Sequence, residues 1–192
     1  MRGLVVVGLV LVALGAASST DPRPVEPVRA IEGPVALLGE SYAVGLEPEL
    51  GRLARGLGLE LLPFGEVGQH VEGLRRTIPR ARAQGARMAI VVSGGNDYGR
   101  SDSANVAAQI RAAVAELEGL TIWYVSPPTT PFPDRSGALA SWIDALGGRA
   151  WLDSRGRALE RAAGDKLAHP SGQGYRDWAY RIWSFILEGA PS

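Results

Sequence analysis

Four polar segments of this 192-residue chain contain residues that could carry out nucleophilic chemistry. Ser41, in the segment LLGESYAVGL, could act as a nucleophile, and His169, in DKLAHPSG, could act as its base. An imidazole suits that role because it changes its protonation state near neutral pH. Gly68 could place a backbone N–H close to a reacting carbonyl, and Asn96 supplies a side-chain amide donor. The four residues together supply a nucleophile, a base and two hydrogen-bond donors.

Each of these residues also has an ordinary structural interpretation. A serine at the start of a helix is commonly an N-cap, so Ser41 could simply satisfy orphan backbone donors. Gly68 fits a turn, Asn96 followed by Asp97 is common turn chemistry, and a single histidine is more often structural than catalytic. The hydrolase elbow pattern Gly-any-Ser-any-Gly is absent, because Ala43 stands where the second glycine belongs.

The segments that must position these residues alternate between short apolar runs and stretches of helical period from Pro34 onward. This alternation is typical of a parallel sheet wrapped by helices. Five apolar runs predict strands at residues 34–38, 59–64, 88–92, 121–125 and 150–153, of which the last is the least marked. Apolar residues at helical spacing predict four helices. The first two carry Leu46, Leu50, Leu53 and Leu57, and then Val71, Leu74 and Ile78, after which Pro79 marks a break or a new start. The last two carry Val106, Ile110, Ala113, Val114 and Leu117, and then Tyr175, Trp178, Ala179, Ile182, Phe185 and Ile186.

These repeats predict an α/β fold, namely a three-layer, flavodoxin-like sandwich with a five-stranded parallel sheet in the order 2-1-3-4-5 and helices on both faces. Ligands of such sheets bind at the carboxyl ends of the strands. Ser41, Gly68 and Asn96 follow the first three strands, whereas His70 is expected to be incidental. Residues 126–142 are polar and rich in proline, and we expect this loop to shape a substrate pocket.

The composition fits a single domain without disulfides. The chain is 46% hydrophobic and long enough to bury one sizeable core. Its 20 basic and 20 acidic residues balance, so we expect no nucleic-acid partner, and the arginines between residues 75 and 87 are interpreted as a solvated helix face. The absence of cysteine excludes disulfides, thiolate catalysis, cysteine-ligated zinc and a lipid-modified cysteine.

The N-terminus has the pattern of a secretory signal peptide. Arg2 precedes an apolar run from Leu4 to Leu14, and small residues follow. We therefore predict a signal peptide over residues 1–19, a stiff proline-rich linker over residues 20–33 and one domain over residues 34–192. The protein is expected to be exported, periplasmic or secreted, without stable membrane insertion once the signal peptide is removed. A retained membrane anchor is the alternative.

In this order, the four polar segments resemble the SGNH (GDSL-like lipase/esterase) hydrolase superfamily, and the resemblance extends from Val35 to Ile186. The first block of the family reads Gly-Asp-Ser, the second contributes a glycine, the third reads Gly-any-Asn-Asp, and the last reads Asp-any-any-His-Pro. The matching residues are Gly39-Glu40-Ser41, then Gly68, then Gly94-Gly95-Asn96-Asp97, and then His169-Pro170.

This chain departs from the family pattern at two positions. Glu40 replaces the usual aspartate, and Asp165 precedes His169 by four residues rather than three. If the segment is extended, this offset turns the acid toward the other side of the chain, so a direct contact requires a turn or a bulge there.

The resemblance implies an exported serine esterase that hydrolyses a carboxylic ester through an acyl-enzyme. Ser41, Asp165 and His169 would be its catalytic residues, and the backbone N–H groups of Ser41 and Gly68 would form the oxyanion hole with the side chain of Asn96. The substrate would be a small-molecule or glycan ester, such as an O-acetyl group of an envelope or extracellular glycan, and the reaction would require no metal or organic cofactor. An acyltransferase, or a non-catalytic carbohydrate-binding or envelope-assembly module on the same scaffold, remains an alternative.

Overall fold

The computed structural model describes residues 33–128, 132–147, 151–155, 159–165 and 169–189. The predicted signal peptide lies outside these residues, and so does all of the predicted linker except Gly33. None of the helices in these ranges is both long and apolar enough to cross a membrane.

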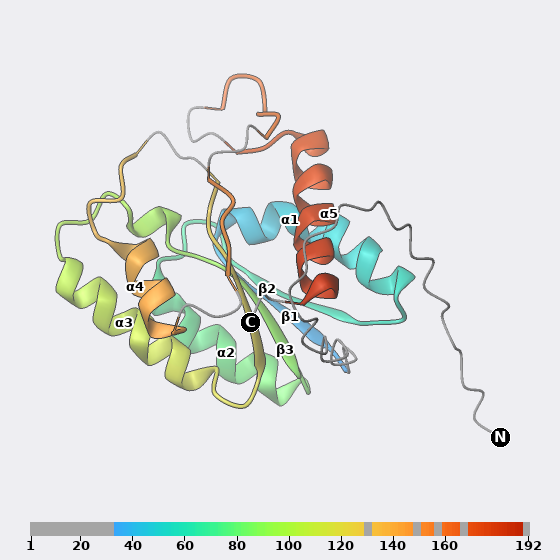
Figure 1. Cartoon of the computed structure of the whole chain (residues 1–192), viewed down its shortest axis with the longest axis horizontal. Coiled ribbons are helices and arrows are strands. Elements are labelled where there is room, and N and C mark those ends of the chain that lie inside the picture. Colours follow the sequence, from blue (N-terminus) through green and yellow to red (C-terminus); the bar gives the residue numbers. More distant parts are fainter. Residues whose placement is uncertain (1–32, 129–131, 148–150, 156–158, 166–168, 190–192) are drawn as a thin grey trace, which may run out of the picture.

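Five parallel strands form a single sheet (Figure 1). Their order is β2-β1-β3-β4-β5, so the predicted flavodoxin-like order is confirmed. The strands are β1 (Val35–Gly39), β2 (Leu61–Gly65), β3 (Met88–Val92), β4 (Thr121–Val125) and β5 (Trp151–Leu152). In the register of the sheet, Gly39 lies opposite both Gly65 and Val92. The first three strands therefore end level with one another, and the segments that follow them start from neighbouring points.

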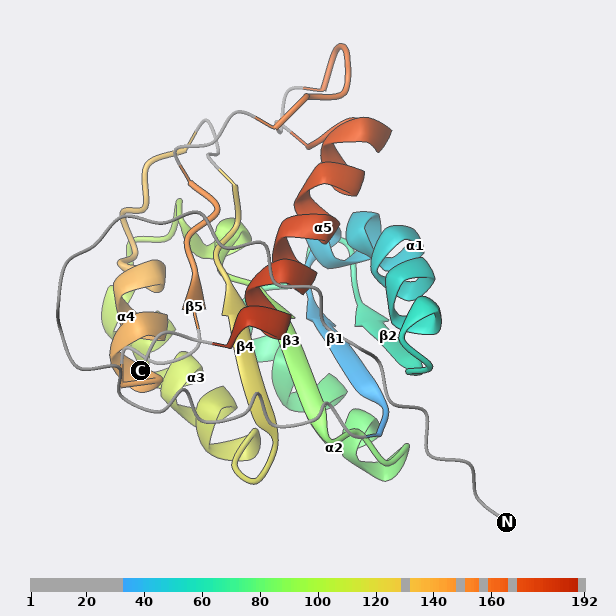
Figure 2. The same ribbon diagram turned by 45° about the vertical axis from the view of Figure 1, so that its right-hand side comes forward.

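Helices cover both faces of the sheet, which confirms the predicted three layers (Figure 2). One face is covered by α1 (Ser41–Gly56) and α5 (Gly172–Glu188), and the other by α2 (Leu74–Ala83), α3 (Ser103–Glu116) and α4 (Ala138–Ala145). Alternate residues of β1 point to opposite faces, as the period of a strand requires. Val35 and Leu37 pack against α1 and α5, whereas Ala36 and Leu38 belong to the core on the other side.

Three local predictions were wrong. The segment 126–142 is not a loop throughout, because α4 begins within it, where the side chain of Asp134 accepts hydrogen bonds from the backbone N–H groups of Ala138 and Leu139. Pro79 does not break α2, since the burial of the helix face around it offsets one lost backbone hydrogen bond. Leu57 does not share the buried face of α1, because the helix ends at Gly56 and the Leu57 side chain is 48% exposed.

Candidate active site

The turn between β1 and α1 places Ser41 at the carboxyl edge of the sheet. Gly39 has φ +142°, and a Cβ atom there would overlap the carbonyl oxygen of Val92, so only glycine fits this close approach of two strands. Glu40 occupies the N-cap position and Ser41 is the first residue of the helix. The interpretation of Ser41 as an N-cap is therefore wrong, and its hydroxyl is engaged elsewhere.

A continuous chain of hydrogen bonds joins Ser41, His169 and Asp165. Ser41 Oγ lies 2.9 Å from Nε2 of His169, and Nδ1 of the same ring lies 2.7 Å from Oδ2 of Asp165. The imidazole packs against the ring of Tyr42, with 5.1 Å between ring centroids, and Tyr42 in turn meets the buried Trp178 edge-on. The ring of His169 is thus held at both nitrogens and on one side by side-chain packing.

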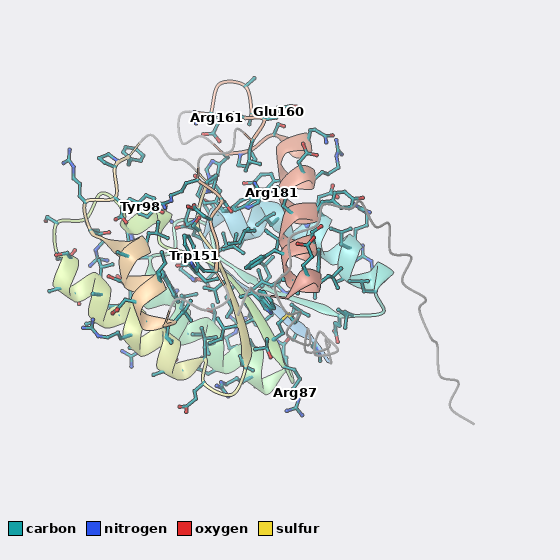
Figure 3. All side chains as sticks on the ribbon, in the orientation of Figure 1. Arg87, Tyr98, Trp151, Glu160, Arg161 and Arg181 are labelled. Carbon is teal, nitrogen blue, oxygen red and sulfur yellow. The ribbon has the colours of Figure 1, made fainter. Side chains whose placement is uncertain are left out.

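A turn brings Asp165 to His169 despite the four-residue offset. Gly164 has φ +79°, and the backbone N–H of Asp165 donates to the carbonyl oxygen of Ala162 at 3.2 Å. The backbone N–H of Ala162 donates to the carbonyl oxygen of His169 at 3.0 Å, so the two sides of the segment run back alongside each other. Figure 3 shows this segment, with Glu160 and Arg161, beside the first turn of α5. The structure thus contains the turn that direct contact requires.

The two further donor candidates follow β2 and β3. Gly68 is an exposed turn residue with φ +76°, and Asn96 is exposed in the short 3-10 helix Gly95–Asp97. One N–H of the Asn96 side-chain amide donates to the carbonyl oxygen of Gln69 at 2.9 Å. An amide nitrogen carries two hydrogens, so the second remains to meet a substrate oxygen. The contact also ties the turn that carries Asn96 to the turn that carries Gly68.

Glu40 is a site residue whose contacts the sequence did not predict. Its side chain is fully buried and accepts hydrogen bonds from the backbone N–H groups of Gly95 and Asn96, each at 2.9 Å. Burial raises the pKa of the Glu40 carboxyl to about 8, although these two N–H groups favour the charged form. The nearby charge of Asp97 raises it further. The one signal in the sequence that could have indicated a role for Glu40 is its position as an ionisable residue directly before Ser41.

His70 and Asp97 form a pair that is separate from the hydrogen-bond chain of Ser41, His169 and Asp165. Asp97 is fully buried and accepts hydrogen bonds from the backbone N–H of Val71 at 3.1 Å and from Nδ1 of His70 at 3.2 Å. Burial raises the pKa of the Asp97 carboxyl, and the neighbouring N–H of Val71 opposes that shift. The ring nitrogen of His70 is therefore directed to Asp97, whereas Ser41 meets His169. Within the described ranges, no three His, Cys, Asp or Glu side chains are grouped so that they could hold a metal ion.

The arrangement can activate a hydroxyl toward a carbonyl carbon. When the carboxylate of Asp165 accepts a hydrogen bond from Nδ1–H of His169, Nε2 of the same ring is left as the acceptor for the hydroxyl of Ser41. The resulting alkoxide would form at a helix N-terminus, where the helix dipole and free N–H groups favour negative charge.

The comparisons with known proteins place the fold. No family model and no curated protein matches the sequence. Among solved structures, a lipase/acylhydrolase from Enterococcus faecalis superposes with a TM-score of 0.68 at 15% identity, covering 83% of this chain and 98% of its own. A putative lipolytic protein of the G-D-S-L family from Desulfitobacterium hafniense superposes with a TM-score of 0.63 at 17% identity, covering 79% of this chain and 99% of its own. An acetyl xylan esterase from Geobacillus stearothermophilus superposes with a TM-score of 0.59 at 15% identity, covering 83% of this chain and 97% of its own.

Proposed function

We propose that this chain, which has the fold of the SGNH hydrolase superfamily, is a serine esterase that hydrolyses carboxylic esters through an acyl-enzyme. The observation that carries the proposal is the hydrogen-bond chain from Ser41 through His169 to Asp165, with distances of 2.9 Å and 2.7 Å. These hydrogen-bonded side chains lie at the carboxyl edge of the sheet, where α/β folds bind their ligands.

Acylation begins when Oγ of Ser41 attacks the ester carbonyl carbon and passes its proton to Nε2 of His169. Asp165 holds the Nδ1 proton and stabilises the imidazolium that forms. The tetrahedral oxyanion accepts hydrogen bonds from the backbone N–H groups of Ser41 and Gly68 and from the second amide hydrogen of Asn96. Each such donor lowers the barrier by ~3 kcal/mol in a preorganised site.

Collapse of the tetrahedral intermediate breaks the bond to the alkoxy group, which leaves as an alcohol with the proton from His169. A water molecule then attacks the acyl-enzyme, and His169 takes a proton from it as general base. The second tetrahedral intermediate releases the carboxylic acid and restores the hydroxyl of Ser41. Apart from the ester and one water molecule, these steps use only groups of the chain itself.

The exposure of the proposed oxyanion-hole donors and the predicted export both support an ester carried on a large molecule as the substrate. Gly68 and Asn96 are exposed, and Val67 beside them has a side chain that is 78% exposed. An ester carried on a bulky alcohol, such as an O-acetyl group on an extracellular glycan, can reach such donors without entering an enclosed cavity. The acetyl xylan esterase of similar fold acts on a substrate of this kind.

A non-catalytic binding module on the same scaffold is less well supported. Binding alone gives no reason to join a hydroxyl, an imidazole and a carboxylate by two successive hydrogen bonds of 2.9 Å and 2.7 Å. An acyltransferase would form the same acyl-enzyme and differ only in the acceptor. Adding acceptor alcohols to the assay separates the two activities, because transfer produces a new ester instead of free acid.

The test is ester hydrolysis by the purified protein. We expect release of p-nitrophenol from short p-nitrophenyl esters and of acetate from acetylated xylan, with loss of both in Ser41→Ala and His169→Ala. His70→Ala is the matched control, because His70 pairs with Asp97 rather than with Ser41. Full activity of Ser41→Ala, with correct folding, would refute the proposal.

A further inference from the structure

Glu40 joins two elements that the reaction needs. It lies between β1 and Ser41, yet both of its carboxyl oxygens are directed across the sheet edge to the turn after β3. Oε1 accepts from the backbone N–H of Gly95, and Oε2 accepts from that of Asn96. Although Glu40 occupies the N-cap position of α1, its side chain makes no capping hydrogen bond. Its carboxyl therefore serves the neighbouring turn and not its own helix.

The length of the glutamate side chain matches the absence of a side chain at Gly95. A Cβ atom built on Gly95 would lie 2.6 Å from Oε1 of Glu40, and 3.3 Å from the ring of Pro127. The carboxyl of Glu40 thus fills the space that any other residue at position 95 would occupy. An aspartate at position 40 would end one methylene earlier and leave this space open.

Keeping this carboxyl buried is costly. No cation of the described ranges pairs with Glu40. Its charged and titratable neighbours are Asp97 and Tyr98 of the turn after β3, Tyr42 of α1, and Tyr124 of β4. An unpaired buried acid destabilises a fold unless its hydrogen bonds compensate for the loss of water. A buried acid directly beside the nucleophile candidate therefore calls for a role in the site.

We propose, on the basis of the proposed esterase function, that Glu40 is a positioning residue that fixes the Asn96 turn relative to Ser41. Holding the backbone N–H groups of Gly95 and Asn96 sets where the Asn96 amide lies when the oxyanion forms. Contact of the amide with Gln69 supplies a second point of support for the same side chain. Misplacing a catalytic donor by ~1 Å is enough to cost ~100-fold in rate.

Glu40→Gln tests this role. Glutamine has the size of the acid, but its NH₂ group cannot accept a hydrogen bond, so one of the two backbone N–H groups loses its partner. Because burial raises the pKa of Glu40 and so favours a neutral side chain at this position, we expect neutral Gln to be accommodated without loss of the fold. With p-nitrophenyl acetate, we expect kcat to fall at least ~10-fold and KM to change less than ~3-fold.

A double-mutant cycle separates positioning from general destabilisation. If Glu40 acts through Asn96, adding Glu40→Gln to Asn96→Ala lowers kcat by less than ~3-fold further. Glu47→Gln, the same change on the exposed surface of α1, is the matched control and should stay within ~2-fold of the original protein. Multiplicative losses in the double variant, or an unchanged kcat in Glu40→Gln, would overturn the proposal.

The space shared by Glu40 and Gly95 gives a compensation test. Gly95→Ala should lower kcat in the original protein, because its Cβ displaces the carboxyl of Glu40. In the Glu40→Asp background the same change should cost at least ~3-fold less, since the shorter acid leaves room. The contact of the new Cβ with Pro127 is the same in both backgrounds, so it does not affect the difference between the two costs. An equal loss of kcat in the two backgrounds would contradict the inference that Glu40 fills the space beside Gly95.

A readout independent of activity completes the test. Backbone amide exchange at Gly95 and Asn96, followed by NMR, should be at least ~10-fold faster in Glu40→Gln than in Glu47→Gln. Unchanged exchange at both amides overturns the proposal whether or not the protein hydrolyses esters. Failure of this inference is thereby distinguished from failure of the proposed function, which Ser41→Ala tests separately.

Discussion

Replacing Asp165 by asparagine removes a charge beside His169 while keeping the shape of the side chain. In the structure, Oδ2 of Asp165 lies 2.7 Å from Nδ1 of His169, and the two side chains are 25% and 22% exposed. The carboxylate therefore has two effects. It stabilises the imidazolium that forms during acylation, and it selects the tautomer whose Nε2 can accept the proton of Ser41.

The magnitude follows from these distances and exposures. Two unit charges with centres ~4 Å apart attract by roughly 1 kcal/mol in bulk water and roughly 4 kcal/mol at an effective dielectric constant of about 20. Partial exposure places this pair between the two limits, and a loss of about 2.7 kcal/mol corresponds to a 100-fold lower rate. The amide NH₂ of asparagine also favours the wrong tautomer. We therefore expect Asp165→Asn to lower kcat by at least ~100-fold.

The assay is steady-state hydrolysis of p-nitrophenyl acetate, with kcat and KM measured separately and the fold checked by circular dichroism. Asp153→Asn is the matched control, because that carboxylate pairs with Arg155 at 3.0 Å and not with His169. It should stay within ~3-fold of the original protein. A loss below ~3-fold in Asp165→Asn, beside a large loss in His169→Ala, would refute the reasoning and indicate a Ser-His pair oriented by another group.

Two further predictions concern stability and processing. The folded pKa of Glu40 is raised from 4.5 to about 8, so the folded state holds a proton that the unfolded state releases. The contribution of Glu40 to the free energy of unfolding should therefore be greatest below pH ~4.5 and decrease by up to ~1.4 kcal/mol per pH unit as the pH rises to ~8, and urea titrations of Glu40→Gln should lack this contribution. In a bacterial host, N-terminal sequencing should find a mature chain that begins between Ala17 and Asp21 outside the cytoplasm, whereas an intact Met1 in the membrane fraction would support the anchor.

The strands and helices could be predicted from the sequence because their signals are local, and the sheet order then followed from the flavodoxin-like pattern of five βα repeats. The run MAIVV at β3 is short, β-branched and bounded by glycines, and the helices on either side repeat their apolar residues at a constant spacing. Once a parallel sheet is inferred, Ser41, Gly68 and Asn96 are placed at one edge by the rule that governs such sheets. The structure brings the Asn96 and Gly68 turns together and places Ser41 against His169.

The parts that were missed depend on particular side-chain contacts that apolar spacing does not report. The start of α4 is set by Asp134, which follows the proline-rich stretch and accepts hydrogen bonds from the backbone N–H groups of Ala138 and Leu139. The turn that Asp165 needs to reach His169 was anticipated from the four-residue offset, but the backbone hydrogen bonds that hold it have no signature in the sequence. Glu40 contacts backbone groups that lie 55 and 56 residues away, and backbone donors have no sequence signature.

Covalent labelling by a fluorophosphonate tests the central claim most directly, because such a probe reacts with a serine that a neighbouring base has activated. We expect the protein to be labelled, mass spectrometry of the digested protein to place the adduct on Ser41, and Ser41→Ala to remain folded and unlabelled. Ser184→Ala, which removes an exposed hydroxyl on α5, should be labelled like the original protein. Equal labelling of Ser41→Ala, or no labelling of the folded original protein, would contradict the account.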